Sequence, residues 1–374
     1  MSQKICIIGD GLTSLITALS LSENNLQISL IGDFKKKEDS RVTAISPSNF
    51  DFLKKITGNK VKNYFWNCKN IKLYHEEGTK YLKFMDIEND GKNLMYIVKN
   101  SDLKKHLFSL INKNRKIQVI KKKVERIDIK NTSIYLKKRA INFDFILFCA
   151  GRNSNISKKV FPERAIVDNS EEKAFTCVVK HNLNITNPEQ YFFKEGAFAI
   201  LPFEKKKFSV VWSIRKNYLD INIPLLIKKK LKEILKTEKE IKILKIYSFP
   251  ISLKIKTNFY KNNLLSLGEG SYNIHPLAGQ GFNLILRDIK ELKKTISNHT
   301  SLGLQLQNSQ IFQNFVKSTK SENLLFGLGI NLINKFFDHK NLFHPVKKII
   351  LKDINKNKFL KNLNLRVSDT GILK

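Results

Sequence analysis

The chain has 374 residues, 42% of them hydrophobic, and a formal net charge of +34 at pH 7. Its length and apolar content are sufficient for a large core and two domains, whereas its four cysteines have neither metal-like nor disulfide-framework spacing. No apolar stretch is long enough for a transmembrane helix, and no metal site is expected.

The positive charge comes mainly from lysines that are spread along the whole chain. They are rarely interleaved with aromatic residues, so we expect no nucleic acid as a partner. An anionic membrane surface is the more plausible partner, because such a charge favours it. No signal peptide precedes the first predicted strand, which predicts a cytoplasmic protein, either free or peripheral at the inner face of the membrane.

The first predicted elements form a βαβ unit. Residues 5–8 are a short apolar run that predicts a buried parallel strand, and the turn Gly9-Asp10-Gly11-Leu12-Thr13-Ser14 follows it. A helical pattern covers residues 15–21, and a second strand is predicted at residues 28–31, before Gly32-Asp33. A strand, a glycine turn, a helix and a second strand at this spacing indicate a dinucleotide site.

The glycine turn predicts how such a ligand binds. Gly9 allows the tight turn, and Gly11 lets a pyrophosphate approach the helix N-terminus. Ser14 takes the place of the third glycine and is still small enough for helix–strand packing. Asp33 lies near the place where a carboxylate accepts hydrogen bonds from a ribose.

The next segment, residues 39–48, reads DSRVTAISPS and precedes a predicted helix. Ser46 or Ser48 is expected to cap that helix, with Pro47 in its first turn. Arg41 has two interpretations. It is either a solvated loop residue or a guanidinium that reaches the phosphates or the ring of a cofactor.

The middle of the chain predicts short strands and two helices. The helices are expected at residues 102–111, with Ser101 as cap, and at residues 224–235; a hairpin is expected around Asn131-Thr132. The predicted strands are residues 71–74, 81–84, 94–98, 117–120, 143–148, 175–179, 191–193, 198–201 and 208–212. The helix at residues 102–111 and the strand at 117–120 return to the alternating pattern of the nucleotide domain, and the four strands from residue 175 to 212 alternate as a mostly antiparallel sheet. The substrate sheet is therefore expected to be inserted in pieces, and the nucleotide domain to be discontinuous.

The stretch from Gly268 to Asn283 follows a predicted strand at residues 264–267 and leads into a helix. It reads GEGSYNIHPLAGQGFN and places a proline and two glycines at the junction. A helix that begins this way directs free backbone N–H groups and the positive end of its dipole at whatever lies in front. A flavin ring, which becomes anionic on reduction, would be held well there.

The C-terminal part is predicted to be helical. Apolar residues recur at helical spacing between Leu324 and Phe337, and a similar pattern resumes after His344-Pro345. A helical cap packed on the body is one interpretation; the alternative is an interfacial surface that docks to lipid. We expect Gly327 and Gly329 to permit close helix packing.

These segments together resemble the FAD-dependent aromatic hydroxylases of ubiquinone biosynthesis. This group is the 2-polyprenyl-phenol hydroxylase family, which is related to para-hydroxybenzoate hydroxylase. The resemblance covers most of the chain and includes LMYIVKNSDLKKHL at 94–107, GAFAILPF at 196–203 and SVVW at 209–212. Its most specific motif is HPLAGQGFNL, which begins at His275.

The resemblance implies an α/β fold. We expect a doubly wound, Rossmann-like FAD-binding domain, an inserted and mainly antiparallel β-sheet substrate domain, and a C-terminal helical region. The expected FAD-binding parts are residues 1–70, 99–165 and 261–310. The expected substrate-domain parts are residues 71–98 and 166–260, and the C-terminal helical region is residues 311–374.

The resemblance also implies the reaction. NAD(P)H reduces FAD, O2 adds to the reduced flavin, and a flavin C4a-hydroperoxide hydroxylates the ring of a polyprenylated phenol. The implied partners are this phenol, O2, a membrane surface and other enzymes of quinone biosynthesis. Two alternatives stay open: a flavin-dependent lipid or quinone oxidoreductase that inserts no oxygen, and a non-catalytic flavin-binding subunit.

The family's site residues carry over to matching positions. The backbone at Val124 would touch the adenine, Glu269 the ribityl chain and Pro276 the isoalloxazine. The amides around Gly279 to Gly281 would stabilise the N1–C2=O edge of the reduced ring. The full implied set of cofactor-binding residues is Gly9, Gly11, Ser14, Asp33, Arg41, Val124, Gly268, Glu269, Pro276, Gly279, Gln280, Gly281 and Asn283.

His275 and Pro276 are the candidate catalytic residues at the flavin face. The alternative for His275 is a structural role, in which a hydrogen bond from the buried ring holds the strand-to-helix turn.

The chain departs from the family pattern at several positions, among them Tyr272, where the family has His. Glu269 stands where the family usually has Asp, and Gly32 occupies the usual place of the acidic residue that ends the second strand. Ala150 replaces the Asp of an Ala-Asp-Gly-x-x-Ser motif. Because that Asp helps to organise the site for flavin and reduced nicotinamide, its absence affects the expected use of a hydride donor more than FAD binding.

Overall fold

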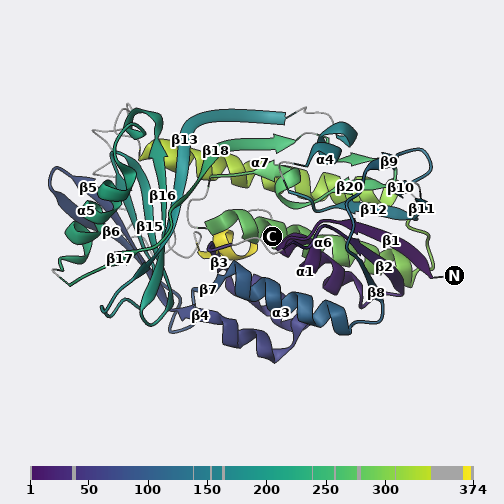
Figure 1. The fold of residues 1–374 in the computed structure, drawn as a ribbon, viewed down its shortest axis with the longest axis horizontal. Coiled ribbons are helices and arrows are strands. Elements are labelled where there is room, and N and C mark those ends of the chain that lie inside the picture. Colours follow the sequence, from purple (N-terminus) through teal and green to yellow (C-terminus); the bar gives the residue numbers. More distant parts are fainter. Residues whose placement is uncertain are drawn as a thin grey trace.

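The computed structural model describes most of the chain. The described residues are 2–35, 39–137, 139–151, 154–161, 165–237, 239–256, 258–275, 279–307, 309–337 and 365–371. A six-stranded sheet lies at one end of the molecule and a nine-stranded sheet at the other, and a long helix, α7, runs along both (Figure 1). Among the described residues, no helix combines the length and the apolar character that crossing a membrane requires.

The six-stranded sheet is the predicted Rossmann-like part. Its order is β19-β20-β12-β1-β2-β8, and all its pairings except β19 with β20 are parallel. The strands are β1 (Gln3–Ile8), β2 (Leu26–Ile31), β8 (Ile117–Ile120), β12 (Phe145–Phe148), β19 (Tyr260–Lys261) and β20 (Leu264–Ser266). Because β1 lies between β2 and β12, the order reverses there, and a crevice for ligands is expected at the carboxyl ends of these strands.

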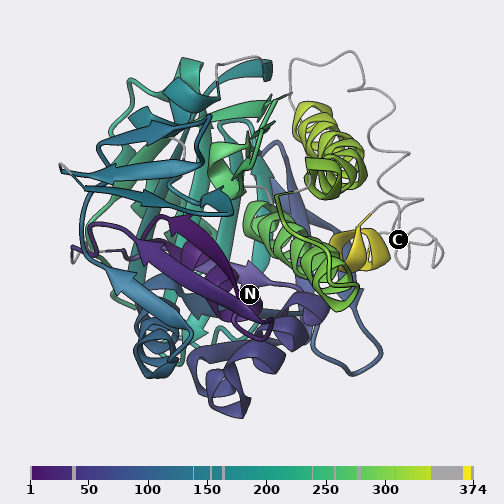
Figure 2. The same cartoon turned by 90° about the vertical axis from the view of Figure 1, so that its right-hand side faces the viewer.

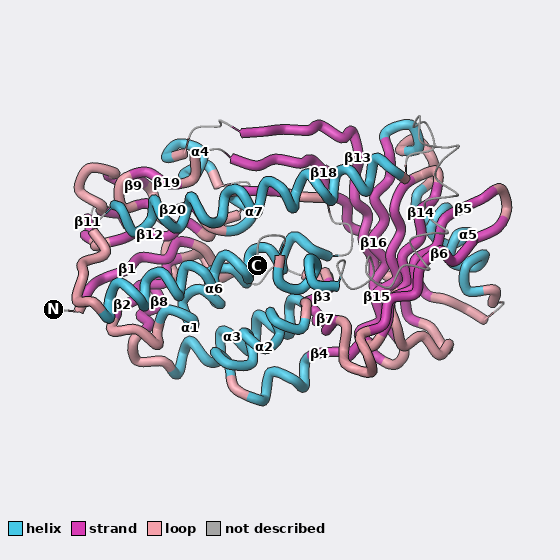
Figure 3. Tube along the Cα trace, turned by 180° about the vertical axis from the view of Figure 1, so that it is seen from behind, coloured by secondary structure: helices cyan, strands magenta, loops and turns pink. Residues whose placement is uncertain are grey.

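The two faces of this sheet are covered differently. Helices α1 (Leu12–Leu21), α3 (Asn100–Lys113) and α6 (Gln280–Ser301) pack on one face, where they share the largest core with the strands (Figure 3). The other face is covered by the antiparallel strands β9 (Arg126–Asp128), β10 (Ser133–Leu136) and β11 (Arg139–Asn142), together with α4 (Asn155–Val160). The hairpin around Asn131-Thr132 is confirmed, because β9 and β10 pair across it.

The nine-stranded sheet confirms the inserted, mainly antiparallel sheet. Its only parallel pairing within the described chain joins β14 to β5. Its strands are β5 (Asn70–Glu77), β6 (Lys80–Glu88), β13 (Ala165–Lys180), β14 (Glu189–Phe193), β15 (Gly196–Glu204), β16 (Lys207–Arg215), β17 (Lys242–Ile243), β18 (Tyr247–Lys256) and β21 (Tyr272–Asn273). Helix α5 (Ile223–Leu235) packs its buried Ile227 and Leu231 into the core around Trp212.

A small antiparallel sheet connects the two large ones. It consists of β3 (Val42–Ile45), β7 (Met95–Lys99) and β4 (Phe65–Cys68), and it shares a core with β15. Helix α2 (Pro47–Thr57) follows β3, and short 3-10 helices cover Asn59–Tyr64, Lys216–Tyr218 and Gly268–Gly270. The expected Ser101 cap is wrong, because α3 begins one residue earlier, at Asn100, after Lys99. The domain boundaries given above stay a prediction.

Helix α7 (Ser309–Phe336) ties the ends of the molecule together. Near its start Phe312 stacks on Phe145 of β12, and just beyond its end Phe337 stacks on Phe192 of β14. At about 1.5 Å per residue, its 28 residues span roughly 40 Å. It lies beside α6 (Figure 2). This confirms the helical prediction for residues 324–336, and Phe337 lies just beyond the helix. His344-Pro345 and the pattern after it lie outside the described residues.

The two glycines of α7 behave differently from each other. A Cβ at Gly327 would lie 3.0 Å from the Cδ1 of Ile255, so this glycine does permit close packing. A Cβ at Gly329 would meet no atom within 4 Å, so the packing prediction for this residue is wrong.

Candidate cofactor crevice and substrate cavity

The turn after β1 is shaped as the fingerprint predicts. Gly9 has a φ of +145°, and a Cβ there would lie 2.4 Å from the carbonyl oxygen of Cys149, so no side chain fits. Gly11 is the N-cap of α1, with open space where its Cβ would be, and none of the described side chains caps the helix. The hydroxyl of Ser14 donates to the carbonyl of Gly11 at 2.8 Å. The first N–H groups of α1 are therefore free for an anion, which fits the pyrophosphate of FAD.

Three separate turns meet beside this helix. A Cβ at Gly268 would lie 3.0 Å from Cγ2 of Thr13, so the turn after β20 packs on the first turn of α1. A Cβ at Gly270 would lie 3.6 Å from the carbonyl oxygen of Gly151, in the turn after β12. The turns after β1, β12 and β20 thus meet at the carboxyl edge of the sheet, where a dinucleotide is expected to bind.

The start of α6 is joined to the segment at residues 39–48. Gly279, the N-cap of α6, is left-handed with a φ of +66°, and its Cβ would lie 3.2 Å from that of Ala44. Asn283 donates to the carbonyl of Ala44 at 3.0 Å and accepts from the N–H of Ser46 at 2.9 Å and the Nδ2 of Asn49 at 3.1 Å. The structure therefore gives Asn283 a role as a tie between two motifs, and its contact with the cofactor stays a prediction.

A cavity of about 160 Å³ lies between these joined motifs. Arg41, Glu269, Gly279 and Gly281 line it together, so the structure brings four predicted cofactor residues to one place. The guanidinium of Arg41 is held by Asp39, with Nε to Oδ1 and Nη2 to Oδ2 both at 2.9 Å. None of the described side chains caps α6, so its first N–H groups are available to a ligand in that part of the structure, as at α1.

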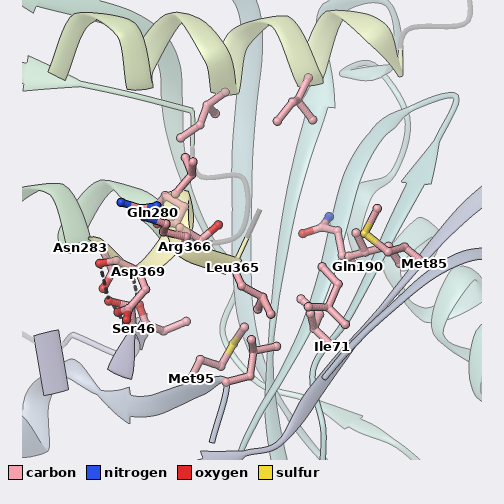
Figure 4. A pocket seen from close by; sticks show the side chains of 18 of the residues that line it. Ser46, Ile71, Met85, Met95, Gln190, Gln280, Asn283, Leu365, Arg366 and Asp369 are labelled. Atoms are coloured by element: carbon pink, nitrogen blue, oxygen red, sulfur yellow. Dashed lines mark hydrogen bonds between the residues drawn. The ribbon is translucent and has the colours of Figure 1, made fainter. Parts of the chain in front are cut away.

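A second, much larger cavity of about 1050 Å³ begins at the same helix end (Figure 4). One wall is the turn after β3 with the start of α6, and the opposite wall is the face of β5, β6 and β14. Helix α7 and the segment at residues 365–370 close the remaining sides. The apolar lining residues are Ala44, Ile45, Pro47, Ile71, Leu73, Phe84, Met85, Ile87, Leu94, Met95, Phe192, Phe326, Gly329, Ile330, Leu332, Ile333, Phe336, Phe337, Leu365 and Val367.

Gln190 is the polar exception on the sheet wall. Its side chain is 4% exposed, and its Nε2 donates to the carbonyl of Phe198 at 3.0 Å. A carbonyl oxygen can only accept, which fixes the amide orientation and leaves the Oε1 of Gln190 toward the cavity (Figure 4). On the opposite wall, the Oε1 of Gln280 is buried without a hydrogen-bond partner in the described chain.

The C-terminal segment at residues 365–371 closes the cavity by capping α2. The N–H of Ser48 donates to a carboxylate oxygen of Asp369 at 2.8 Å, and its hydroxyl donates to the carbonyl of Asp369 at 3.0 Å. Ser46 is the N-cap residue and Pro47 the first helical residue, as predicted, but neither Ser46 nor Ser48 caps the helix with its own side chain. A carboxylate from the far end of the chain replaces that cap.

His275 lines neither of these cavities as far as the chain is described. Its Nε2 lies 2.8 Å from Oε2 of Glu172 on β13, and the Nδ2 of Asn334 on α7 donates to Oε1 of Glu172 at 3.1 Å. Burial favours the neutral acid, but the hydrogen bond from His275 holds the pKa of Glu172 below its usual value. This geometry supports the structural role for His275. Pro276 lies outside the described residues.

The remaining residues named from the sequence follow the strands β2, β8 and β12. Asp33 follows Gly32 after β2, and its side chain is 54% exposed and pairs with the Nζ of Lys35 at 3.3 Å. Val124 is buried against the face of the sheet that β9 to β11 cover. Ala150 packs against the same cluster, next to Cys149. All four cysteines are free and buried, which confirms their interpretation as small core residues.

A buried polar cluster joins α6 to α7 behind the crevice. Asp288 accepts from the hydroxyl of Tyr272 at 2.6 Å and from the Nδ2 of Asn323 at 3.1 Å. Burial raises the pKa of Asp288 from its usual value of 3.8 to about 7. Tyr272 thus fills the core and holds α6.

Sequence reasoning missed most of the large cavity. The apolar alternation of β5 and β6 and the helical spacing in α7 were visible, and they indicated buried faces. They could not show that these faces leave space between them, because that depends on how far apart the sheet and α7 lie. Gln190 gave no sequence signal at all.

Comparisons with known proteins agree with this geometry. No family model matches the chain. It is 22% identical to the mitochondrial ubiquinone biosynthesis monooxygenase COQ6 of Dictyostelium discoideum, over 97% of this chain and 90% of that protein. It is 21% identical to 3-demethoxyubiquinol 3-hydroxylase of Escherichia coli, over 99% of this chain and 96% of that protein.

Among solved structures, the fold is similar to that of p-nitrophenol 4-monooxygenase from Pseudomonas putida. The TM-score is 0.83 at 11% identity, with 99% of this chain and 98% of the other covered. A second similar structure, Klebsiella pneumoniae HpxO complexed with FAD, has a TM-score of 0.77 at 10% identity, with both chains covered completely. The predicted fold class is confirmed, and the relatives bear out the resemblance stated from the sequence.

Proposed function

We propose that this relative of the ubiquinone-biosynthesis hydroxylases is an FAD-dependent monooxygenase. It hydroxylates the aromatic ring of a polyprenylated phenol in ubiquinone biosynthesis, with NAD(P)H as reductant and O2 as oxygen source. The observation that carries the proposal is the junction at the start of α6. There two cavities are lined by neighbouring residues of the same two segments: Gly279 and Gly281 line the small cavity with Arg41 and Glu269, and Gln280 lines the large cavity, whose walls are mainly apolar.

The residues of the crevice fit FAD in three ways. The uncapped N-terminus of α1 next to Gly11 suits the pyrophosphate. Glu269 and Arg41 line one small cavity, where the ribityl chain is expected. The N-terminus of α6, where no described side chain caps the helix, would offer N–H groups and the positive end of its dipole to a ring that becomes negative on reduction. When bound, FAD would supply the electron transfer and the O2 activation.

The chain itself would bind the substrate, orient it and exclude water. A cavity of about 1050 Å³ is at the upper end of the usual range for ligands, roughly 300–1,000 Å³. Its apolar walls suit a hydrocarbon tail, for which each buried CH2 contributes about 0.8 kcal/mol. The Oε1 of Gln190 is an acceptor on an otherwise apolar wall. We assign it to the phenol O–H of the substrate.

The proposal places the protein in the cytoplasm, peripheral at the inner face of the membrane, where a polyprenylated substrate is dissolved. The support is the net charge of +34 and four large apolar side chains of α7 that are 40–67% exposed, Leu325, Leu328, Leu332 and Ile333. Leu332 and Ile333 also line the cavity, so a lipid-facing surface would be continuous with the substrate site. Flotation with vesicles tests this: binding to anionic but not to neutral vesicles is expected, and equal recovery with both contradicts it.

The reaction is tested with purified protein, NAD(P)H, a short-chain prenylated phenol and 18O2. The phenol is expected to accelerate NAD(P)H oxidation, and the product to contain one 18O atom. NAD(P)H oxidation with a changed substrate but no 18O would favour the oxidoreductase without oxygen insertion. A flavin-bound protein that never oxidises NAD(P)H would favour the non-catalytic subunit. The hydroxylase names of the relatives do not favour either alternative.

A further inference from the structure

The end of β2 lacks the acidic side chain that dinucleotide-binding folds usually have there. In those folds a carboxylate about 20 residues after the glycine turn accepts hydrogen bonds from the ribose. Here Gly32 follows β2, and the next residue, Asp33, is 54% exposed and pairs with Lys35. Asp33 therefore faces solvent and is a poor candidate for this contact.

Asp10 occupies the space that an acidic side chain at position 32 would need. A Cβ added at Gly32 would lie 3.0 Å from the Cβ of Asp10. The Oδ2 of Asp10 accepts from the N–H of Phe34 at 3.2 Å, which anchors the carboxylate across the end of β2. Phe34 is itself fixed, because it packs against Phe108 with ring centroids 5.3 Å apart. Gly32 and Asp10 are thus complementary: the glycine leaves the room that the aspartate fills.

The second oxygen of this carboxylate is available to a ligand. In the part of the chain that the structure describes, neither a hydrogen bond nor an ion pair engages the Oδ1 of Asp10, and this oxygen is not sealed from solvent. It lies next to Gly11, where the N-terminus of α1 is open. A carboxylate here therefore stands between the pyrophosphate site and the end of β2.

We propose that Asp10, in place of Asp33, is the carboxylate that accepts the hydrogen bond from the adenosine ribose of FAD. The acidic group has moved from the end of β2 to the glycine turn, and Gly32 makes that move sterically possible. This assignment rests on the proposed function, since it requires FAD as the ligand.

The test compares two ligands and three proteins. The full-length protein is freed of flavin, and dissociation constants are measured by fluorescence quenching for FAD and for an analogue that lacks the adenosine 2′-hydroxyl. The variants are Asp10→Asn and the matched control Asp33→Asn. Asparagine at position 10 keeps an amide oxygen for the N–H of Phe34 but replaces the free carboxylate oxygen with an NH2 group.

The wild type is expected to bind FAD about 10- to 150-fold more tightly than the deoxy analogue, as for a hydrogen bond to a charged group. Asp10→Asn should lose most of this preference because it binds FAD more weakly and the deoxy analogue as before. Asp33→Asn should keep the preference of the wild type. If Asp10→Asn weakens binding of both ligands equally, the substitution acts on the fold of the turn, and the assignment is overturned. It is also overturned if Asp33→Asn abolishes the preference. Asp10→Ala, which leaves nothing to donate or accept, should behave as Asp10→Asn does.

The outcomes separate this inference from the proposed function. A wild type that binds FAD and hydroxylates its substrate while Asp10→Asn retains the full preference for FAD refutes the inference alone. A wild type that binds neither ligand refutes both.

Discussion

Replacement of Gln190 by Met tests how the cavity recognises a phenol. Methionine has nearly the same length as glutamine but no donor and only a weak acceptor, so the shape of the wall is kept. In the wild type, Gln190 is 4% exposed and its Nε2 is held by the carbonyl of Phe198 at 3.0 Å. Its Oε1 is therefore fixed toward the cavity before a substrate arrives, and the variant removes only this acceptor from the ligand's surroundings.

The magnitude follows from the burial of the site. A hydroxyl group that is buried without a partner costs about 1–3 kcal/mol, which corresponds to a roughly 5- to 150-fold weaker binding of the phenol. The contribution of the prenyl tail, about 0.8 kcal/mol per CH2, stays the same because the apolar lining is unchanged. The effect is thus specific to the ring hydroxyl.

The assay uses the change in flavin absorbance on ligand binding. Dissociation constants are measured for a prenylated phenol and for its O-methyl ether, with wild type, Gln190→Met and the control Met85→Leu. Gln190→Met should weaken binding of the phenol and leave the dissociation constant of the ether within about twofold of the wild-type value. The coupling energy of the double-mutant cycle formed by the two proteins and the two ligands should then be about 1–3 kcal/mol. Met85→Leu, on the same wall of the cavity, should change the dissociation constants of both ligands by the same factor. Equal losses for phenol and ether in Gln190→Met would refute the reasoning.

Three further predictions test the crevice and its supports. Gly279→Val places a β-branched side chain at a φ of +66° and 3.2 Å from Ala44, so the purified variant should lose the yellow colour of bound flavin. The control Gly329→Ala adds a methyl group in open space and should keep the colour, and retained flavin in Gly279→Val would contradict our placement of the ring. Asp288 has a pKa raised to about 7, so between pH 4 and 7 its carboxyl keeps its proton in the folded protein but loses it in the unfolded chain, and its contribution to stability falls as the pH rises through this range. From pH 5 to 8 the free energy of unfolding of the wild type, measured by urea denaturation, should fall by up to about 3 kcal/mol relative to that of Asp288→Asn, and parallel pH profiles of the two proteins would disprove this. Glu172→Ala leaves both ring nitrogens of His275 without a hydrogen-bond partner among the described residues and should cost about 1–3 kcal/mol of stability, while Glu172→Gln should restore most of it. A shifted pH profile of kcat/KM in Glu172→Gln with unchanged stability would instead favour a catalytic His275.

The local patterns of the sequence predicted most elements of the fold. The apolar run before Gly9 and the glycine turn after it could be interpreted without tertiary information, because a buried parallel strand and a left-handed or crowded glycine have local signatures. The inserted sheet, α5 and α7 were likewise visible from their periodicity. Helix caps were less predictable: Asp369 caps α2 from more than 300 residues away, and no local rule could indicate it.

The candidate site likewise has features that local sequence predicts and features that depend on contacts between remote segments. By itself, the sequence determined that glycine turns follow the apolar strands at residues 5–8 and 264–267 and that a helix follows each turn. Free N–H groups and a helix dipole are local properties of such a turn, so the sequence alone was sufficient to predict a dinucleotide site. Only the tertiary structure decided which carboxylate lies at the end of β2 and which apolar faces leave a cavity between them. Both depend on distances between segments that are remote in the chain, such as Asp10 with Gly32 and β14 with α7, and those distances are set by the packing of the whole core.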